Sequence, residues 1–190
     1  MVGTVLVPLN GLDALSPAAF RRQRSKYSGR EAVLDAQITP DGLLFNDTVH
    51  CAPLHPHQLY QLRARMGLLP QARTDGARPF WTPGRFFEVP VERLRAHATY
   101  WYHWKTPWIN GYPGEDVALA PPVDEFEPFD FARYRELPAV PSAHTAYLEQ
   151  CKAEGKPALT FVHIPHVLVA GPIETIGLRQ ISWNRDPLVE

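Results

Sequence analysis

The sequence predicts a single α+β domain in which three to four helices pack on a mostly antiparallel or mixed sheet. Short β-branched and aromatic runs mix with amphipathic helical patterns, but they lack the regular strand–helix–strand rhythm of a parallel sheet. The chain has 190 residues, of which 45% are hydrophobic, and this is enough to bury one core of ordinary size. Its 20 prolines occur singly, which is typical of turns and not of a linker. We therefore expect residues 1–190 to form one domain.

The first quarter of the chain is expected to hold a strand, a helix and a hairpin. Residues 5–7 form a short apolar run that stops at a proline. Ser16 can cap the free N–H groups of a helix that starts at Pro17 and continues into basic residues. Residues 31–38 and 43–45 are predicted to pair as a hairpin, because the proline and glycine between them suit a tight turn.

The middle of the chain predicts two helices and two strands. Residues 56–66 place their apolar side chains on one helical face, and Gly67 follows where a C-terminal cap belongs. Residues 85–89 are predicted to form a strand and residues 91–97 a helix. Residues 99–104 are aromatic or β-branched for the most part, and we expect them to form another strand.

The C-terminal half opens with a long irregular stretch. Residues 105–141 show no sustained periodicity apart from one turn of helix near 131–135, so we expect a loop-rich insertion wrapped on the core. Residues 142–154 predict the clearest helix of the chain, ended by Gly155. Three further strands are expected, at residues 159–162, 167–170 and 175–183.

Bulk properties predict a soluble cytoplasmic protein without a membrane partner. The formal net charge is −1, so no overall field favours nucleic acid or an anionic membrane surface. No apolar run reaches the roughly 18 residues that a membrane span requires. Cys51 and Cys151 are too few for a disulfide framework and suit a reducing compartment, although one bridge between them stays open.

Histidines are concentrated just ahead of the helix predicted at 56–66, and they are the strongest functional signal. His50, His55 and His57 can bind a metal ion or move protons near neutral pH. His55 and His57 lie two apart in a segment that proline keeps extended, so both rings can reach one point. His163 and His166 flank a second proline and can join them. We expect either a divalent metal site, such as zinc, or a histidine acid–base centre. The alternative is that His55 and His57 mark the entry to a helix, with capping and solvent contacts, and that His50 is a half-buried strand residue.

Asp47 is the acidic neighbour of this cluster. Its carboxylate can orient the imidazole of His50, as carboxylates do in many catalytic sites. The alternative is that Asn46 and Asp47 form a turn, which is the commonest use of such a pair. The predicted catalytic set is therefore His50, Asp47, His55 and His57, with the turn as the competing interpretation of Asp47.

One basic run follows the first helix and suggests a phosphate ligand. Its cations are Arg21, Arg22, Arg24, Lys26 and Arg30. Arginine can hold a phosphate through two parallel hydrogen bonds, and serine and glycine in the same run suit an anion site. The alternative is a solvated helix face whose cations complement the helix C-terminus.

Aromatic residues are unusually dense at residues 99–104. On a strand, alternate side chains share a face, so Trp101 and Trp104 lie on opposite faces. One face must be core, and the other can stack on a base, a sugar or a peptide. The alternative is aromatic packing beneath the loop predicted at 105–141.

These patterns together predict a small enzyme that acts on a phosphate-bearing small molecule, a nucleotide or nucleic acid. Histidine would serve as acid–base group or metal ligand, in hydrolysis or group transfer. The rival function is a non-catalytic module that binds nucleic acid or protein through the basic helix and the aromatic strand. A structural or assembly protein, present as a homo-oligomer, is the third alternative.

Overall fold

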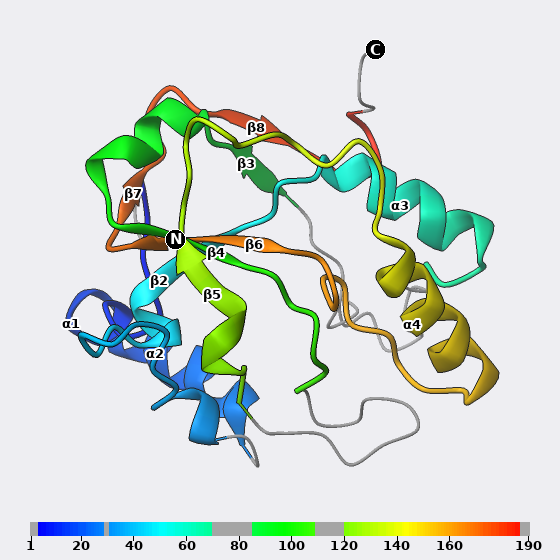
Figure 1. Ribbon diagram of the computed structural model, residues 1–190, viewed down its shortest axis with the longest axis horizontal. Coiled ribbons are helices and arrows are strands. Elements are labelled where there is room, and N and C mark those ends of the chain that lie inside the picture. The colour runs from blue at the N-terminus through cyan, green and yellow to red at the C-terminus, as the bar shows by residue number, and fades with distance from the viewer. Residues whose placement is uncertain (1–3, 29–30, 70–84, 109–119, 187–190) are drawn as a thin grey trace.

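A computed structural model of the chain describes residues 4–28, 31–69, 85–108 and 120–186. It confirms the α+β class: the described residues form one body built on antiparallel strand pairs and helices (Figure 1). The strands are β1 (Val5–Leu6), β2 (Thr48–Cys51), β3 (Phe86–Glu88), β4 (Thr99–Tyr102), β5 (Phe126–Pro128), β6 (His166–Ala170), β7 (Ile173–Glu174) and β8 (Arg179–Ile181). The α-helices are α1 (Leu12–Leu15), α2 (Pro17–Arg24), α3 (Pro56–Arg65) and α4 (Ser142–Ala153). None of the described helices is long and apolar enough to span a membrane.

A four-stranded antiparallel sheet forms the centre of the fold, with the strand order β2-β6-β4-β5. In its register His50 pairs with Leu168, and Thr99 pairs with Val169. Two small sheets, β1-β7 and β3-β8, lie outside it. In Figure 1, α3 and α4 lie on the opposite side of the molecule from α1 and α2.

Strand β6 is buried on both faces, which is why its sequence is continuously apolar instead of alternating. Leu168 belongs to a core cluster with Tyr102 and Leu148 on one face of the sheet. Val169 points to the other face and belongs to a second cluster with Leu94. In the centre of the sheet, Leu168 pairs with His50 on one side and with Tyr100 on the other.

Four of the predicted elements differ in the structure. Residues 31–38 are not a strand: they begin with a 3-10 turn, Glu31–Val33, and keep only an isolated bridge between Gln37 and Leu44. The 3-10 turn buries Val33 completely. The expected hairpin turn keeps a hydrogen bond from the amide of Ile38 to the carbonyl of Leu43 (2.8 Å).

The strand predicted at 159–162 is also wrong, because side chains of α4 take the hydrogen bonds that a neighbouring strand would have made. The hydroxyl of Tyr147 accepts from the amide of Leu159 (3.0 Å), and His144 donates to the carbonyl of Val162 (2.6 Å). The helix predicted at 91–97 is a 3-10 helix, Val91–Ala96. The strand predicted at 175–183 shrinks to β8, since Gly177 turns the chain at a φ of +74°.

The irregular stretch contains one strand that the sequence did not indicate. Residues 109–119 lie outside the described residues, but β5 pairs with β4 and places Phe126 opposite Tyr102. Near residue 137 the stretch packs against the core, where the amide of Leu137 donates to the carbonyl of Pro53 (2.7 Å). Cys51 and Cys151 are free thiols, so no bridge links them.

Candidate functional site

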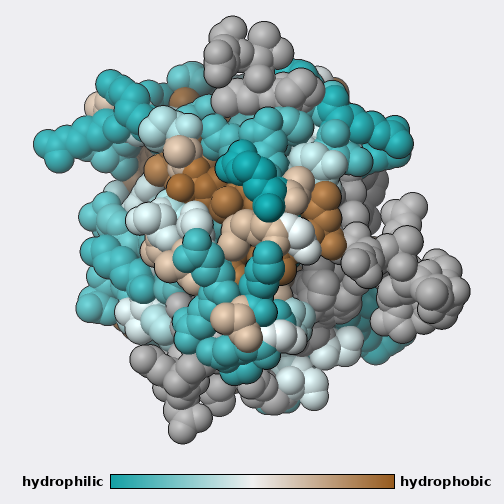
Figure 2. Space-filling view, turned by 90° about the vertical axis from the view of Figure 1, so that its right-hand side faces the viewer, coloured by the Kyte–Doolittle hydropathy of each residue, from teal (hydrophilic) through white to brown (hydrophobic). Residues whose placement is uncertain are grey.

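A cavity of about 720 Å³ lies beside β2, the N-terminus of α3 and the β3-β8 pair. Pockets that bind small molecules usually have volumes between roughly 300 and 1,000 Å³. Its polar lining consists of His50, Cys51, His55, Arg85, Glu88, Tyr134, Glu136, His166 and Gln180. The face of the protein that carries α3 and α4 shows apolar side chains gathered at its centre with hydrophilic residues around them (Figure 2).

Apolar and aromatic side chains form the rest of the cavity wall. The rings of Phe86 and Phe161 meet edge to face at 6.1 Å, and Phe161 meets the ring of His166 at 6.0 Å in the same way. Phe129 and Tyr134 line the cavity as well, with their ring centroids 5.3 Å apart. A mostly apolar wall with a few polar groups is the usual composition of a small-molecule site.

His50 lies on the edge strand β2, is exposed, and lines the cavity. Its Nε2 lies 3.1 Å from the carbonyl oxygen of Phe45, and the two rings meet edge to face at 4.3 Å. A carbonyl can only accept, so Nε2 must carry the proton in the neutral ring. The lone pair of Nδ1 is then left without a hydrogen-bond partner among the described residues.

His166 is the first residue of β6 and lies beside His50 on the same face of the sheet. The two ring centroids are 5.9 Å apart and the rings are perpendicular, at 89°. The Nδ1 of His166 donates to the carbonyl of Ile164 (2.8 Å). Its Nε2 therefore keeps a lone pair, and no described residue forms a hydrogen bond with it.

Both imidazoles are uncharged at neutral pH. The protein atoms packed around the ring of His50 partly desolvate it and lower its pKa, although its hydrogen bond to the Phe45 carbonyl opposes part of that shift. Burial lowers the pKa of His166 to about 3, and the neighbouring His50 adds to the effect. A second proton on this pair would place two cations side by side, which the low-polarity surroundings disfavour.

Two acidic groups of the cavity also stay neutral. Burial raises the pKa of the Cys51 thiol to about 11, so it is no thiolate nucleophile at neutral pH. Burial raises the pKa of Tyr134 to about 12, with smaller contributions from Glu136 and Cys51. Neither the Cys51 thiol nor the Tyr134 hydroxyl is therefore ionised to act as a base at neutral pH.

His55 and His57 do not join the pair formed by His50 and His166. His55 precedes the first residue of α3, and its Nδ1 accepts from the amide of His57 (3.3 Å), so its ring serves as a helix cap that also lines the cavity. Burial lowers the pKa of His55. The Nδ1 of His57 lies 2.8 Å from the carbonyl oxygen of Trp183, and its ring stacks on Tyr60. His57 does not line the cavity.

His163 lies elsewhere in the core, and the geometry gives no support to a metal site. Its backbone has a φ of +58°, and its Nδ1 lies 3.0 Å from the carbonyl oxygen of Trp104. Within the described ranges, no group of three His, Cys, Asp or Glu side chains lies close enough to hold a metal ion. A metal would need three or four converging ligands, and among the described residues of the cavity only the imidazole rings of His50 and His166 meet.

Asp47 occupies the turn that was the competing interpretation of its role. It ends the 3-10 turn Phe45–Asp47, where its carboxylate accepts from the amide of Leu44 (3.0 Å) and from Asn10 Nδ2 (2.7 Å). The group that orients His50 is the carbonyl of Phe45, not this carboxylate.

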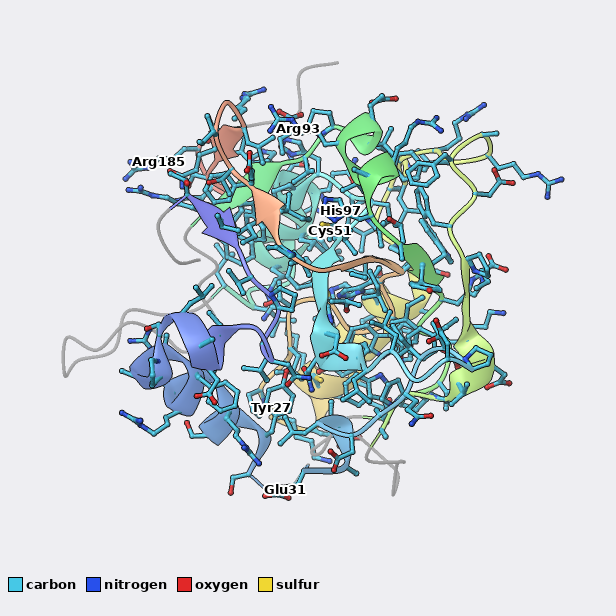
Figure 3. All side chains as sticks on the ribbon, turned by 90° about the vertical axis from the view of Figure 1, so that its left-hand side faces the viewer. Tyr27, Glu31, Cys51, Arg93, His97 and Arg185 are labelled. Carbon is cyan, nitrogen blue, oxygen red and sulfur yellow. The ribbon has the colours of Figure 1, made fainter. Side chains whose placement is uncertain are left out.

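The basic segment lies apart from the cavity. Arg21, Arg22 and Arg24 are exposed on α2, and Arg21 and Arg24 line a separate, shallow depression of about 300 Å³ that also includes Glu31. Figure 3 shows Tyr27 and Glu31, from the rim of this depression, at the lower end of the molecule and Cys51 far above them. Arg30 and the side chain of Lys26 lie outside the described residues.

The aromatic strand is packed inside the protein. Trp104 is buried and stacks on Tyr102 and Trp108, with 5.5 Å between ring centroids in each pair. Trp101 is half-buried and stacks on Phe129 at 6.1 Å. These contacts support the packing interpretation of residues 99–104.

Several cavity residues had no signal in the sequence. Arg85, Glu88 and Gln180 come from the β3-β8 pair, and Tyr134 and Glu136 from the irregular stretch. The pairing of distant strands brings them together, and no local spacing records that pairing. Comparison with protein-family models, with curated proteins and with solved structures finds no match to this chain, so its function is argued from the geometry of the cavity.

Proposed function

We propose that the protein is an enzyme that binds a small molecule in the cavity and uses His50 as its acid–base group, with His166 as a neighbouring hydrogen-bond acceptor. One observation carries this proposal. Two neutral imidazoles share the wall of an apolar cavity, and each keeps one nitrogen unpartnered among the described residues while a backbone carbonyl holds the other. A fixed tautomer with a free lone pair is what a general base requires.

His50 is better placed than His166 to exchange protons with a ligand. His50 is exposed in the cavity, whereas only 6% of the surface of His166 is accessible. The carbonyl of Phe45 favours the charged ring of His50, because Nε2 still donates to it after Nδ1 gains a proton. His50 can therefore take a proton from a hydroxyl or a water molecule and return it, as hydrolysis or group transfer requires.

The test is turnover on neutral, chromogenic 4-nitrophenyl esters, with water as the hydroxyl donor to His50, by the wild type and by His50→Ala. We expect a loss of about 10²–10⁴-fold in kcat for the variant, which is the usual contribution of a general base. His57→Ala is the matched control, because His57 lies outside the cavity lining and binds the Trp183 carbonyl. Equal turnover by the wild type and by folded His50→Ala would remove the proposal.

Non-catalytic binding of a phosphate-bearing ligand is the second candidate, favoured by the two exposed arginines in the shallow depression. It predicts salt-sensitive binding of a short oligonucleotide or a nucleotide that weakens in Arg21→Ala and Arg24→Ala. It also predicts that His50→Ala binds as the wild type does. The assembly alternative has less support, since the most exposed large apolar side chains of the described residues, Leu15, Val123 and Ile176, come from three separate segments.

A further inference from the structure

We infer that the ligand of the cavity is a neutral, largely apolar molecule with a planar ring and a hydroxyl or N–H donor, of the class of phenols and aromatic alcohols. The donor would bond to the free nitrogen of His50 or His166. This inference names the substrate class of the site and therefore rests on the proposed function.

The hydrogen-bonding capacity of the imidazole pair calls for a donor. Nδ1 of His50 and Nε2 of His166 each carry a lone pair and no proton. Neither nitrogen can therefore donate a hydrogen bond to the other. A ligand that only accepts, such as a ketone, a carboxylate or a phosphate, would face these lone pairs without forming a bond. A hydroxyl or N–H group gives one of them its missing donor, and this is worth more inside an apolar cavity than in water.

The charges around the cavity do not favour an anion. Among the described residues its lining has one cation, Arg85, which donates to Gln180 (3.2 Å), and two acids, Glu88 and Glu136. Glu88 is balanced by Arg179 outside the lining, at 3.7 Å. A phosphate dianion would lose its water in this cavity without gaining a cluster of cations from the part of the chain that the structure describes, and the cost of burying an unpaired charge is high.

The wall of the cavity suits a flat ring. Edge-to-face contacts connect Phe86 to Phe161, Phe161 to His166 and His166 to His50, with centroid distances of 6.1, 6.0 and 5.9 Å. These rings form one continuous row along the cavity. A planar ligand can add offset or edge-to-face contacts to such a row while its donor reaches an imidazole.

The experiment compares three probes of one shape, 4-methylphenol, 4-methylanisole and 4-methylphenyl phosphate, by titration calorimetry and amide chemical-shift mapping. We expect 4-methylphenol to bind about tenfold more tightly than 4-methylanisole, which lacks only the donor, because one buried hydrogen bond supplies roughly that factor. The phosphate should cause no shifts at the cavity.

His50→Phe removes the acceptor and keeps a ring, so the preference for the phenol should fall at least threefold. His57→Phe, outside the cavity, should keep it.

The outcomes separate this inference from the proposed function. Equal affinities for the phenol and the anisole, or no binding of either, would overturn the inference while the loss of turnover in His50→Ala would leave the enzyme proposal standing. Tighter binding of the phosphate at the cavity would overturn the inference in favour of an anionic ligand. The preference is measured first on the wild-type protein, so a variant that fails to fold does not decide the result.

Discussion

The rings of His50 and His166 are perpendicular, with 5.9 Å between their centroids, and each ring donates one hydrogen bond to a backbone carbonyl. Neighbouring strands of the sheet carry them, and the register of β2 against β6 sets their spacing. The carbonyls of Phe45 and Ile164 select opposite tautomers: Nε2–H for His50 and Nδ1–H for His166. Backbone carbonyls, not an acidic side chain, therefore fix the tautomers of this pair.

The tautomers can be observed directly. Long-range ¹H–¹⁵N spectra of the labelled protein should show His50 as the Nε2–H form and His166 as the Nδ1–H form, because each ring donates to a fixed carbonyl. Since burial lowers both pKa values, the rings should remain neutral at pH 6.5. His50→Ala and His166→Ala assign the signals. Imidazolium shifts for both rings at pH 6.5, or identical tautomers, would contradict this arrangement.

His144 should make the protein less stable in acid. It is fully buried on α4, its Nδ1 lies 2.6 Å from the Val162 carbonyl oxygen, and burial lowers its pKa to about 4. The unfolded chain binds a proton at about pH 6.5, and the folded chain does so only near pH 4. The stability contributed by neutral His144 is thus complete above pH 6.5 and is lost as the pH falls to 4, at about 1.4 kcal/mol per pH unit.

Urea unfolding at several pH values between 7 and 4 measures this slope. His144→Asn keeps an N–H donor near the position of Nδ1 but does not titrate. The change of its unfolding free energy with pH should therefore be smaller than that of the wild type, by the amount that one bound proton contributes. His50 and His166 remain in the variant, and their lowered pKa values keep part of the acid sensitivity. Identical slopes for the two proteins would show that His144 is protonated equally in the folded and unfolded chains.

Arg63 should contribute more to stability than any exposed arginine of α3. Its guanidinium is buried, with 4% of its surface accessible, and it donates to the carbonyls of Ala158 (3.0 Å) and Leu159 (3.3 Å). These bonds connect α3 to the start of residues 159–162, the segment in which the predicted strand is absent. Arg63→Ala leaves buried carbonyls without donors and should lower the free energy of unfolding by about 2–4 kcal/mol.

Arg65 provides the matched control for Arg63. It lies two residues further along the same helix and is exposed, so Arg65→Ala should change the free energy of unfolding by no more than about 0.5 kcal/mol. Chemical denaturation of both variants gives the comparison. Similar losses in the two variants would mean that the buried bonds of Arg63 add little net stability.

Gly67 ends α3 with a φ of +70°, and no atom lies within 4 Å of the place a Cβ would take. Gly67→Ala should therefore cost about 1–2 kcal/mol through backbone strain alone, since an alanine disfavours the left-handed region. Gly67→Asn should cost less, because asparagine tolerates this conformation better. Thermal unfolding of the two variants tests the order, and an alanine variant as stable as the wild type would contradict it.

Features encoded in a few adjacent residues could be predicted from the sequence. Gly67 and Gly155 end α3 and α4 at positive φ as expected, and Gly42 completes the predicted turn at a φ of +91°. The α+β class also followed from local patterns. Each of these depends on the conformational preference of one residue or on a period within one element.

Features that depend on distant pairing could not be predicted. A strand at His50 was only the competing interpretation of the sequence, and β2 exists because β6, more than one hundred residues later, pairs with it. The same pairing selects His166 as the neighbour of His50 and leaves His57 bonded to Trp183. The density of histidines in the sequence indicated the segment that contributes His50 to the cavity. Which imidazole rings meet there depends on the pairing of β2 with β6.

Cys51 should react slowly with alkylating reagents even though it lines the cavity. It is only partly buried, so a small reagent can reach it, but burial raises the pKa of its thiol to about 11. The thiolate is the reactive form, and at pH 7 its fraction is roughly 100-fold smaller than that of an ordinary cysteine. Iodoacetamide labelling should be slower by about this factor than labelling of the urea-unfolded chain.

The pH dependence of the labelling rate distinguishes a raised pKa from poor access. With the thiol pKa near 11, the rate should rise about tenfold per pH unit through pH 9 and 10, whereas a blocked thiol of ordinary pKa would level off near pH 9. Mass spectrometry of a Cys151→Ala variant assigns the modification to Cys51 alone, since the sulfur of Cys151 is fully buried in the wild type. A plateau near pH 9 would show that the cavity around Cys51 is more polar than its apolar lining implies, and the preference for a neutral ligand would lose its electrostatic basis.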